Sequence, residues 1–481
     1  MNRKRIVFII ATGIVCAVCL LAFRGRHRIN VMDRPALQLG DNIGGTTPTE
    51  SDHSPLTGED KLSAAQVSPW GRFRGPNGLG LSEDSTIPVK WSDTRNLAWK
   101  TALPGAGSSS PVLTDGFVFV TCYSGYGVAG DRGGSPNQLQ RHVCCIDRDS
   151  GAMVWTRTVS AVQQEDRYQG MGLPEHGYAT NTPGTDGAAV FAFLGKSGVY
   201  AFDLSGKELW HVSVGTGSGN REWGSASSLI LYKDLVIVNA AEESQSLYAL
   251  SKDSGEVIWK SPAAALELCY STPAIAHVSP ERDDLILAVP GEVWGINPGN
   301  GKLIWFAETP MTDNLSPSVL VDGATVYAFG GYRNSGSVSL RAGGKGDVTS
   351  SHMLWTSKNT SHVATPVLLN NRLQWVDDHG VYFCADAKSG ELIQRARTSG
   401  ISSGGRPVYA SPVSINQRLY VQSRYGGVFV LERSPELTIL EQNRFASDSS
   451  NFNATPAVDR GQLFLRSDRY LYCISASHPT E

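Results

Sequence analysis

Three polar residues of this sequence, Asn181, Glu222 and Asp377, carry amide or carboxylate oxygens of the kind that can bind a metal ion or take up a proton. Carboxylate and amide oxygens are the ligands that Ca²⁺ takes in proteins. A further carboxylate can serve as a general base when it lies within hydrogen-bond reach of the substrate. The presence of these residue types alone does not establish a catalytic site, so the strands and loops that would bring the three residues together must be identified first.

Other catalytic chemistry has little support in the sequence. No metal-ligand spacing, no Ser-His-Asp order and no glycine-rich phosphate loop between a strand and a helix stands out. His176 is followed by Gly177, and we interpret it as a turn residue. The sequence therefore predicts no metal site and no firm set of catalytic residues.

A turn followed by a tryptophan recurs along the chain and organises the fold. It reads RDSGAMVWT at 148–156, DLSGKELWH at 203–211 and KDSGEVIWK at 252–260, with variants at 298–306 and 387–395. Glycine in such turns supplies the positive φ of a tight hairpin. We interpret each turn as the link between the third and fourth strands of a repeated unit. The tryptophans of the outermost strands are Trp99, Trp155, Trp210, Trp259, Trp305 and Trp355, and Gln394 and Leu440 take their place later.

A second signature, Ser or Thr, usually with Pro, and then a short apolar run, marks the first strand of each unit. The eight copies begin at residues 110, 182, 227, 272, 316, 365, 411 and 455. After a first step of 72 residues the steps are 44 to 49 residues. A period in the mid-forties built from short strands is typical of a four-stranded propeller blade. The sequence predicts an all-β fold, an eight-bladed β-propeller of four-stranded antiparallel blades.

The last unit lacks its fourth strand, and the start of the propeller offers one. The segment NLAWKTALPG, residues 96–105, places Trp99 at the tryptophan position of the repeat. We predict that it completes the last blade and closes the ring, which removes free sheet edges.

The residues before the propeller have a different composition. Three basic residues precede an uncharged apolar run at 6–23, which is at the short end of a membrane span. We expect a signal or anchor segment at 1–30, uncleaved, with a helix through the membrane at 6–23. Residues 31–69 have few large apolar side chains and read as a flexible tether. The propeller is assigned to 70–481.

Net charge argues against one class of partner. Without the six basic residues of the first thirty, the chain carries 36 Lys and Arg against 45 Asp and Glu. An acidic body without a basic run does not suit nucleic-acid binding, which needs a positive surface.

With the repeat laid out, residues 70–476 resemble the pyrroloquinoline-quinone (PQQ)-like β-propeller family, within the quinoprotein alcohol dehydrogenase-like superfamily. The resemblance rests on the SG…W turns, the Ser/Thr-Pro strand starts, the opening stretch WGRFRGPNGLGLS at 70–82 and the stretch at 176–210. That superfamily includes PQQ-dependent alcohol dehydrogenases and also a cofactor-free propeller lipoprotein of outer-membrane β-barrel assembly.

The resemblance leaves three functions open. We favour a non-catalytic binding or scaffold platform of the cell envelope, anchored in the membrane with the propeller outside the cytoplasm. One alternative is a PQQ- and Ca²⁺-dependent dehydrogenase of alcohols or sugars that uses Glu222, Asn181 and Asp377, and another is an envelope protein assembly factor. Adjacent cysteines near PQQ form a disulfide in such dehydrogenases, but Cys144 and Cys145 fall within a third strand, where we expect them to pack as buried residues.

In propellers, ligands and partner proteins bind at the channel mouth, where the loops entering first strands and the loops joining second and third strands converge. We expect the aromatic and charged residues of these loops to bind the protein or small ligand. They are Tyr178, Trp223, Tyr270, Arg333, His379, Tyr409, Arg424 and Tyr425.

Overall fold

The computed structural model describes residues 70–128, 134–162, 164–401, 405–432, 434 and 436–476. The expected anchor helix at 6–23, the rest of 1–30 and the tether at 31–69 lie outside these ranges. Within them, no helix has both the length and the apolar character needed to cross a membrane. The helical elements are η1 (Pro76–Gly78), η2 (Pro136–Gln138), α2 (Leu173–His176), η3 (Gly195–Ser197), α3 (Ala241–Ser244), η4 (Ala264–Leu266) and α4 (Thr349–His352).

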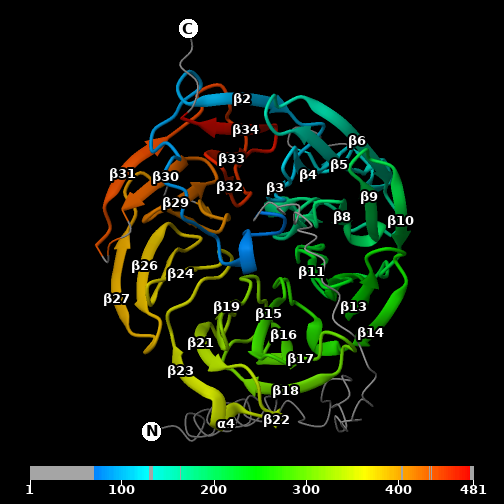
Figure 1. Cartoon of the computed structure of the whole chain (residues 1–481), viewed down its shortest axis with the longest axis vertical. Coiled ribbons are helices and arrows are strands. Elements are labelled where there is room, and N and C mark those ends of the chain that lie inside the picture. The colour runs from blue at the N-terminus through cyan, green and yellow to red at the C-terminus, as the bar shows by residue number, and fades with distance from the viewer. Residues whose placement is uncertain are drawn as a thin grey trace, which may run out of the picture. The chain divides into compact units, whose positions relative to one another are not determined.

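The strands form eight sheets arranged in a ring (Figure 1), which confirms the predicted eight-bladed propeller. Blade 1 comprises β3 (Val112–Leu113), β4 (Phe117–Ser124), β5 (Gln140–Asp147) and β6 (Met153–Ser160), and blade 2 comprises β7 (Gly184–Thr185), β8 (Ala189–Phe193), β9 (Val199–Asp203) and β10 (Glu208–Val212). Blade 3 comprises β11 (Ile230–Tyr232), β12 (Leu235–Ala240), β13 (Ser246–Ser251) and β14 (Val257–Pro262), and blade 4 comprises β15 (Ala274–Ser279), β16 (Arg282–Val289), β17 (Glu292–Ile296) and β18 (Leu303–Glu308).

Blades 5 to 8 follow the same plan, and two short strands extend blades 7 and 4. Blade 5 comprises β19 (Leu320–Asp322), β20 (Thr325–Gly330), β21 (Gly336–Arg341) and β23 (Met353–Ser357), and blade 6 comprises β24 (Val367–Leu369), β25 (Arg372–Val376), β26 (Val381–Asp386) and β27 (Leu392–Arg397). Blade 7 comprises β28 (Val413–Ile415), β29 (Arg418–Ser423), β30 (Gly427–Glu432) and β31 (Ile439–Asn443), and blade 8 comprises β32 (Ala457–Asp459), β33 (Gln462–Arg466), β34 (Tyr470–Ser475) and β2 (Leu97–Ala102). The additions are β1 (Leu81–Ser82), parallel to β28, and β22 (Gly346–Asp347), parallel to β18.

Ring closure occurs as predicted. Strand β2 pairs antiparallel with β34, with Trp99 opposite Cys473, and the two strands lie side by side in Figure 1. At the seam to blade 1, the buried Arg148 forms an ion pair with Asp459 at 2.8 Å and donates to Gln462 Oε1 at 2.6 Å. The first strand of the propeller therefore completes its last sheet.

The recurring turn forms the contact between neighbouring blades, because the tryptophan of one blade packs on the turn of the next. The Trp99 indole donates to the carbonyl of Arg148 in the next blade at 3.0 Å, and the Trp155 indole donates to that of Leu204 at 2.9 Å. A Cβ on the turn glycine Gly151 would lie 2.5 Å from the Trp99 ring, so only glycine allows this contact. The same bond runs from Trp210, Trp259 and Trp355 to the turns of the blades that follow them.

Trp305 departs from this pattern for a structural reason. Blade 5 has no SG turn between β21 and β23 but a longer connection that carries β22 and α4. The Trp305 indole donates instead to the buried Asp284 of its own blade at 2.7 Å.

The assignment of Leu440 to the tryptophan position was wrong by one residue. Glu441 pairs with Val430 before the bulge, as Trp155 pairs with Cys145. Leu440 lies at the bulge and is 42% exposed. In the other seven blades the third strand carries a small residue opposite this position, and Cys145, Cys384 and Cys473 are three of them. Within the described ranges all six cysteines are buried and none forms a disulfide.

Ser and Thr hydroxyls link the inner strands around the channel. The amide of Ser110 donates to Thr182 Oγ1 at 2.9 Å, and the same bond links each successive blade to the next as far as Thr455 in blade 8. The further bonds join Thr182 to Ser228, Ser228 to Thr272, Thr272 to Ser318, Ser318 to Thr365, Thr365 to Ser411 and Ser411 to Thr455. We call these eight residues the hydroxyl ring.

The ring corrects the predicted starts of two blades. Ser228 occupies the Ser/Thr position of blade 3 rather than the proline position, and Ser318 rather than Ser316 occupies it in blade 5. After blade 1 the ring residues are 44 to 47 apart along the chain, a narrower spread than the sequence motif suggested.

The opening stretch 70–80 crosses the axis of the ring, and we call it the axial segment. The carbonyls of Trp70 and Gly71 accept the amides of Leu113 and Thr185 in blades 1 and 2. On the far side, the buried Arg74 donates to the carbonyl oxygens of Thr365, Pro366 and Pro412 in blades 6 and 7. The segment lies at the centre of Figure 1, inside the ring of blades.

Candidate functional site

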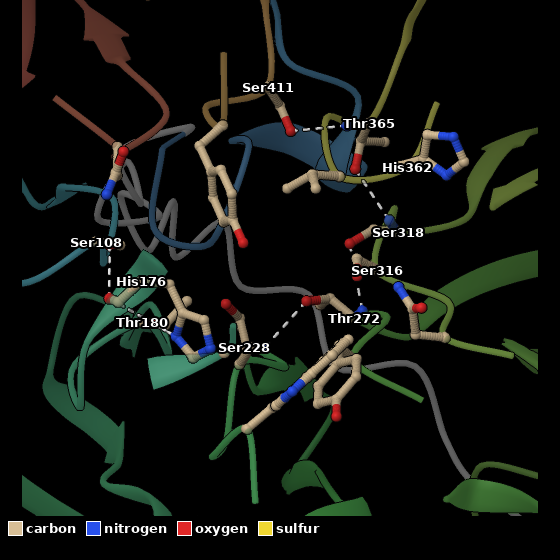
Figure 2. A pocket seen from close by; sticks show the side chains of 18 of the residues that line it. Ser108, His176, Thr180, Ser228, Thr272, Ser316, Ser318, His362, Thr365 and Ser411 are labelled. Atoms are coloured by element: carbon tan, nitrogen blue, oxygen red, sulfur yellow. Dashed lines mark hydrogen bonds between the residues drawn. The ribbon is translucent and has the colours of Figure 1, made fainter. Parts of the chain in front are cut away.

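The open end of the channel contains a cavity of about 140 Å³ on the propeller axis. Phe73 of the axial segment and residues of the hydroxyl ring line its inner part. The rim carries larger side chains from several blades: Trp223, Tyr270, Tyr332, His362 and Tyr409. Figure 2 shows part of this lining, with His362 across the cavity from His176. The loops that join successive blades and those that join second to third strands meet here, and we call this side of the propeller the mouth face.

Part of the long connection between blades 1 and 2 forms a roof over this cavity. Met171, Gly172 and His176, in and before α2, line the cavity. His176 Nδ1 lies 2.7 Å from Thr180 Oγ1, and its carbonyl accepts from Ser108 Oγ at 2.8 Å. Burial lowers the pKa of His176 to about 4, so the ring is neutral at physiological pH.

A buried arginine on the opposite side of the mouth holds the roof. Arg424 of blade 7 forms an ion pair with Glu175 of α2 and donates to its carbonyl oxygen at 3.0 Å. Asn453 donates to the same carbonyl at 3.1 Å and accepts from Arg424 Nε at 2.8 Å. The guanidinium also lies 4.6 Å from the ring centroid of Tyr409. These contacts connect the roof to blades 7 and 8.

Two more arginines line the cavity, and each has a carboxylate partner outside it. Arg221 pairs with Asp313, and Arg406 lies 3.6 Å from the buried Asp378. Among the described residues that line the cavity, none is an aspartate or a glutamate. The lining therefore combines hydroxyls, aromatic rings and cations.

Aromatic side chains of the rim are arranged in pairs. Trp223 stacks on Tyr270 with ring centroids 6.0 Å apart, and Arg221 lies 4.8 Å from the Trp223 ring. Tyr332 meets His362 edge to face at 6.2 Å, and His362 Nδ1 lies 2.9 Å from the carbonyl oxygen of Gly331. Such pairs hold aromatic surface in fixed positions at the mouth.

The expected binding residues divide into three groups. Trp223, Tyr270 and Tyr409 line the cavity, and Arg424 lies behind Tyr409. On the rim, Tyr425 is 58% exposed and the side chain of Arg333 is 83% exposed, 3.6 Å from Asp313, while His379 is exposed on its own loop. Tyr178 is buried in a cluster with Tyr123 and Tyr168 and donates to the carbonyl of Asp166 at 2.7 Å.

The three residues considered for catalysis do not converge on the cavity. Asn181 Nδ2 donates to Ser225 Oγ and to the carbonyl of Ser227, which joins blades 2 and 3. Glu222 is exposed, with a φ of 51°. Asp377 accepts the amides of His379 and Val381 in its own loop, and burial raises its pKa.

Sequence reasoning missed three parts of the site. Phe73 was read as part of a family signature and not as the floor of the channel. The ring hydroxyls were read as strand starts, although their spacing already placed one in every blade. Arg406 follows a glycine pair in a loop and carries no sequence signal.

The profile of a protein family described as outer membrane protein assembly factor BamB matches residues 141–400. No curated protein sequence matches the chain.

Solved structures resemble the fold at low sequence identity. BamB from Moraxella catarrhalis superposes with a TM-score of 0.53 at 14% identity, covering 80% of this chain and 100% of its own. The computationally designed Ika8 protein gives 0.51 at 11% identity, covering 78% and 98%. A quinohemoprotein alcohol dehydrogenase from Pseudomonas putida HK5 gives 0.44 at 12% identity, covering 76% of each chain, a similarity too low to support an argument.

Proposed function

This chain belongs to the PQQ-like propeller family described as outer membrane protein assembly factor BamB, and from that premise we propose that it is a non-catalytic binding platform on the envelope side of a membrane. A partner protein docks on the mouth face. Assembly of envelope proteins is the process that the family description favours for such a platform, and an anchor at 6–23 would hold it at the membrane.

The observation that carries the proposal is the distribution of exposed apolar side chains. Among the described residues, most of the large ones lie on the outermost strands, but three do not: Met171, Tyr332 and Tyr425, which are 61%, 53% and 58% exposed. All three lie on mouth-face loops. Tyrosine and methionine are enriched at protein interfaces, and truncation of a central tyrosine typically weakens binding strongly.

The channel supports a platform rather than a conduit or a cofactor pocket. The axial segment is hydrogen-bonded to inner strands on both sides of the channel, an arrangement that does not suit an open conduit. The cavity of about 140 Å³ is smaller than the roughly 300 Å³ at which sites for drug-sized ligands begin.

The lining of the cavity lacks side chains that a PQQ-dependent dehydrogenase would need. A PQQ–Ca²⁺ centre needs carboxylates for the ion and for the base, and the described lining has none. Within the described ranges, no group of three or more His, Cys, Asp or Glu side chains is placed to hold a metal ion. The residues present do not fit that cofactor. We expect no dye reduction with alcohols or sugars after addition of PQQ and Ca²⁺, and turnover would contradict the proposal.

Site-specific photocrosslinking in the intact envelope tests the platform. A photoreactive residue replaces Tyr332 or Tyr425 in turn, and the matched control replaces Leu209, which is 47% exposed on the outer strand of blade 2. We expect one protein to be captured from both mouth positions and not from position 209. The double substitution Y332A/Y425A should weaken binding of that purified partner at least about tenfold. Capture from position 209 alone, or equal affinity of the double variant, would refute the mouth face as the docking surface.

A further inference from the structure

The hydroxyl ring leaves its own protons without a protein acceptor. Seven of its oxygens accept an amide hydrogen from the preceding blade. A Ser or Thr hydroxyl also carries one O–H donor. Within the described ranges, no ring hydroxyl donates to another protein group. All the ring residues except Thr182 line the cavity, and Figure 2 shows several of them facing it. The cavity wall is therefore a circle of hydrogen-bond donors.

Ser110 shows that the donors lack a partner on the protein side. It is 1% exposed and lines the cavity, and its Oγ has no hydrogen-bond partner among the described residues. A buried polar group without a partner costs about 1–3 kcal/mol. Such a group is normally satisfied by ordered water or by a ligand.

One buried positive charge, that of Arg74, lies beside the hydroxyl ring. Arg74, fully buried, is bound only by carbonyl oxygens, and two of them belong to Thr365 of the ring and to Pro412, next to Ser411. Burial lowers the pKa of Arg74 to about 9, which leaves it charged at neutral pH. Within the described ranges, Arg74 forms no ion pair. A buried charge without a counter-ion is unfavourable.

We propose that the channel cavity binds one small inorganic anion on the propeller axis, held by O–H groups of the hydroxyl ring above Phe73. The hydroxyls supply donors in a circle, Arg74 supplies the positive field, and the lining has no carboxylate to repel the ion. The volume of about 140 Å³ admits a halide or a tetrahedral oxyanion with a few waters. This site is distinct from partner binding on the mouth face and does not depend on it.

Calorimetric titration of the full chain with chloride, bromide, sulfate and phosphate tests the proposal, with gluconate keeping the ionic strength constant. We expect saturable binding of one anion per chain. The substitution S110A removes an inward donor without breaking a protein hydrogen bond, and it should lower the affinity about tenfold. S110T should keep the affinity of the wild type, since Thr occupies the same position in four other blades.

The matched control is S339A. Ser339 also has a buried Oγ without a partner, but it lies opposite Trp355 in blade 5 and does not line the cavity. Alanine occupies the equivalent place in blades 2 and 3, so S339A should fold and bind the anion as the wild type does.

Crystals soaked in sodium bromide locate the ion directly. We expect an anomalous peak on the channel axis in the wild type and a much weaker one in S110A. Absence of the peak, waters alone in the cavity, or an equal loss of affinity in S110A and S339A would each overturn the proposal.

Discussion

Glu243 is a buried carboxyl group in a confined polar cluster. It belongs to α3, is 3% exposed, and its Oε2 has no hydrogen-bond partner among the described residues. Burial raises its pKa to about 8, and the neighbouring Glu242 adds to the shift. The nearby Lys196 is held by Asp166 at 2.8 Å. At neutral pH, Glu243 is therefore mostly protonated in the folded protein.

This shift sets the sign of a pH effect on stability. The folded state keeps the proton up to about pH 8, whereas an unfolded glutamate loses it near pH 4.5. The stabilising contribution is therefore complete below pH 4.5 and is lost as pH rises through 8, at up to about 1.4 kcal/mol per pH unit.

We expect E243Q, which stays neutral, to match the wild type near pH 5 and to exceed its free energy of unfolding by about 1–3 kcal/mol at pH 8.5. Urea unfolding across this pH range measures the difference. The exposed control E256Q should follow the wild-type curve, and an E243Q curve parallel to the wild type would disprove the protonated state.

Among the secondary-structure elements, the turn between the third and fourth strands carries the contacts between blades. Where the next blade has an SG turn, the indole of the preceding blade packs over the turn glycine. The same indole donates a hydrogen bond to the carbonyl oxygen of a residue two or three positions before that glycine. Blades 6 and 7 have Gln394 and Glu441 instead of tryptophan, and the turn of blade 7 that follows Gln394 has no glycine. The tryptophan and the glycine thus act as one unit across a blade boundary.

Substitution of one turn glycine should expose this coupling. In G390A the new Cβ would lie 2.6 Å from the Trp355 ring, at a φ of +71°. We expect a loss of about 2–4 kcal/mol in the free energy of unfolding, the sum of a φ penalty and a steric one. The control G323A has a φ of +59° with nothing within 4 Å of the new Cβ, so it should lose only about 1 kcal/mol. Equal losses in chemical denaturation would mean that the turn conformation, and not indole docking, sets the cost.

In the whole molecule, the seam between blades 8 and 1 holds the two ends of the propeller together. The Arg148 guanidinium binds the carboxylate and the carbonyl oxygen of Asp459 and the side chain of Gln462. The carbonyl oxygen of Arg148 accepts a hydrogen bond from the Trp99 indole. The seam thus combines a buried ion pair with the indole contact that the other blades use.

Loss of this arginine should open the seam. R148M removes the buried partner of Asp459 and leaves it with Arg460, which is 54% exposed and lies 3.2 Å away, so we expect a cost of about 3 kcal/mol, at the low end of the range for breaking a buried pair. We also expect faster hydrogen exchange in β2 and β34 than in β12. The control K252M removes the more exposed pair of Lys252 with Asp186, at 3.3 Å between blades 2 and 3, and should cost at most about 1 kcal/mol. A similar cost in both variants would argue against a special role for the seam.

Much of this architecture is predictable because the repeat is local. Each SG turn and each Ser/Thr start is set by a few neighbouring residues, so the number of blades and the role of Trp99 follow from the sequence. The blade starts at 227 and 316 were misread because Ser227 and Ser316 lie beside the true ring residues, and only the hydrogen bonds between blades separate them. The course of the axial segment, the roof contact of Glu175 with Arg424 and the burial of Tyr178 were beyond prediction, since they join residues far apart without any repeat.

The pairing of β2 with β34 also constrains the order of folding during biosynthesis. Residues 97–102 leave the ribosome long before residues 470–475, and they have no permanent partner until translation of the latter is complete. Blade 8 cannot be completed before residues 470–475 are present, whatever the order in which the other sheets form. A product that terminates before Tyr470 would have an unpaired β2 near its N-terminal end and an incomplete sheet at its C-terminal end. Both would expose unpaired strand edges, which favour aggregation and recognition by chaperones and proteases.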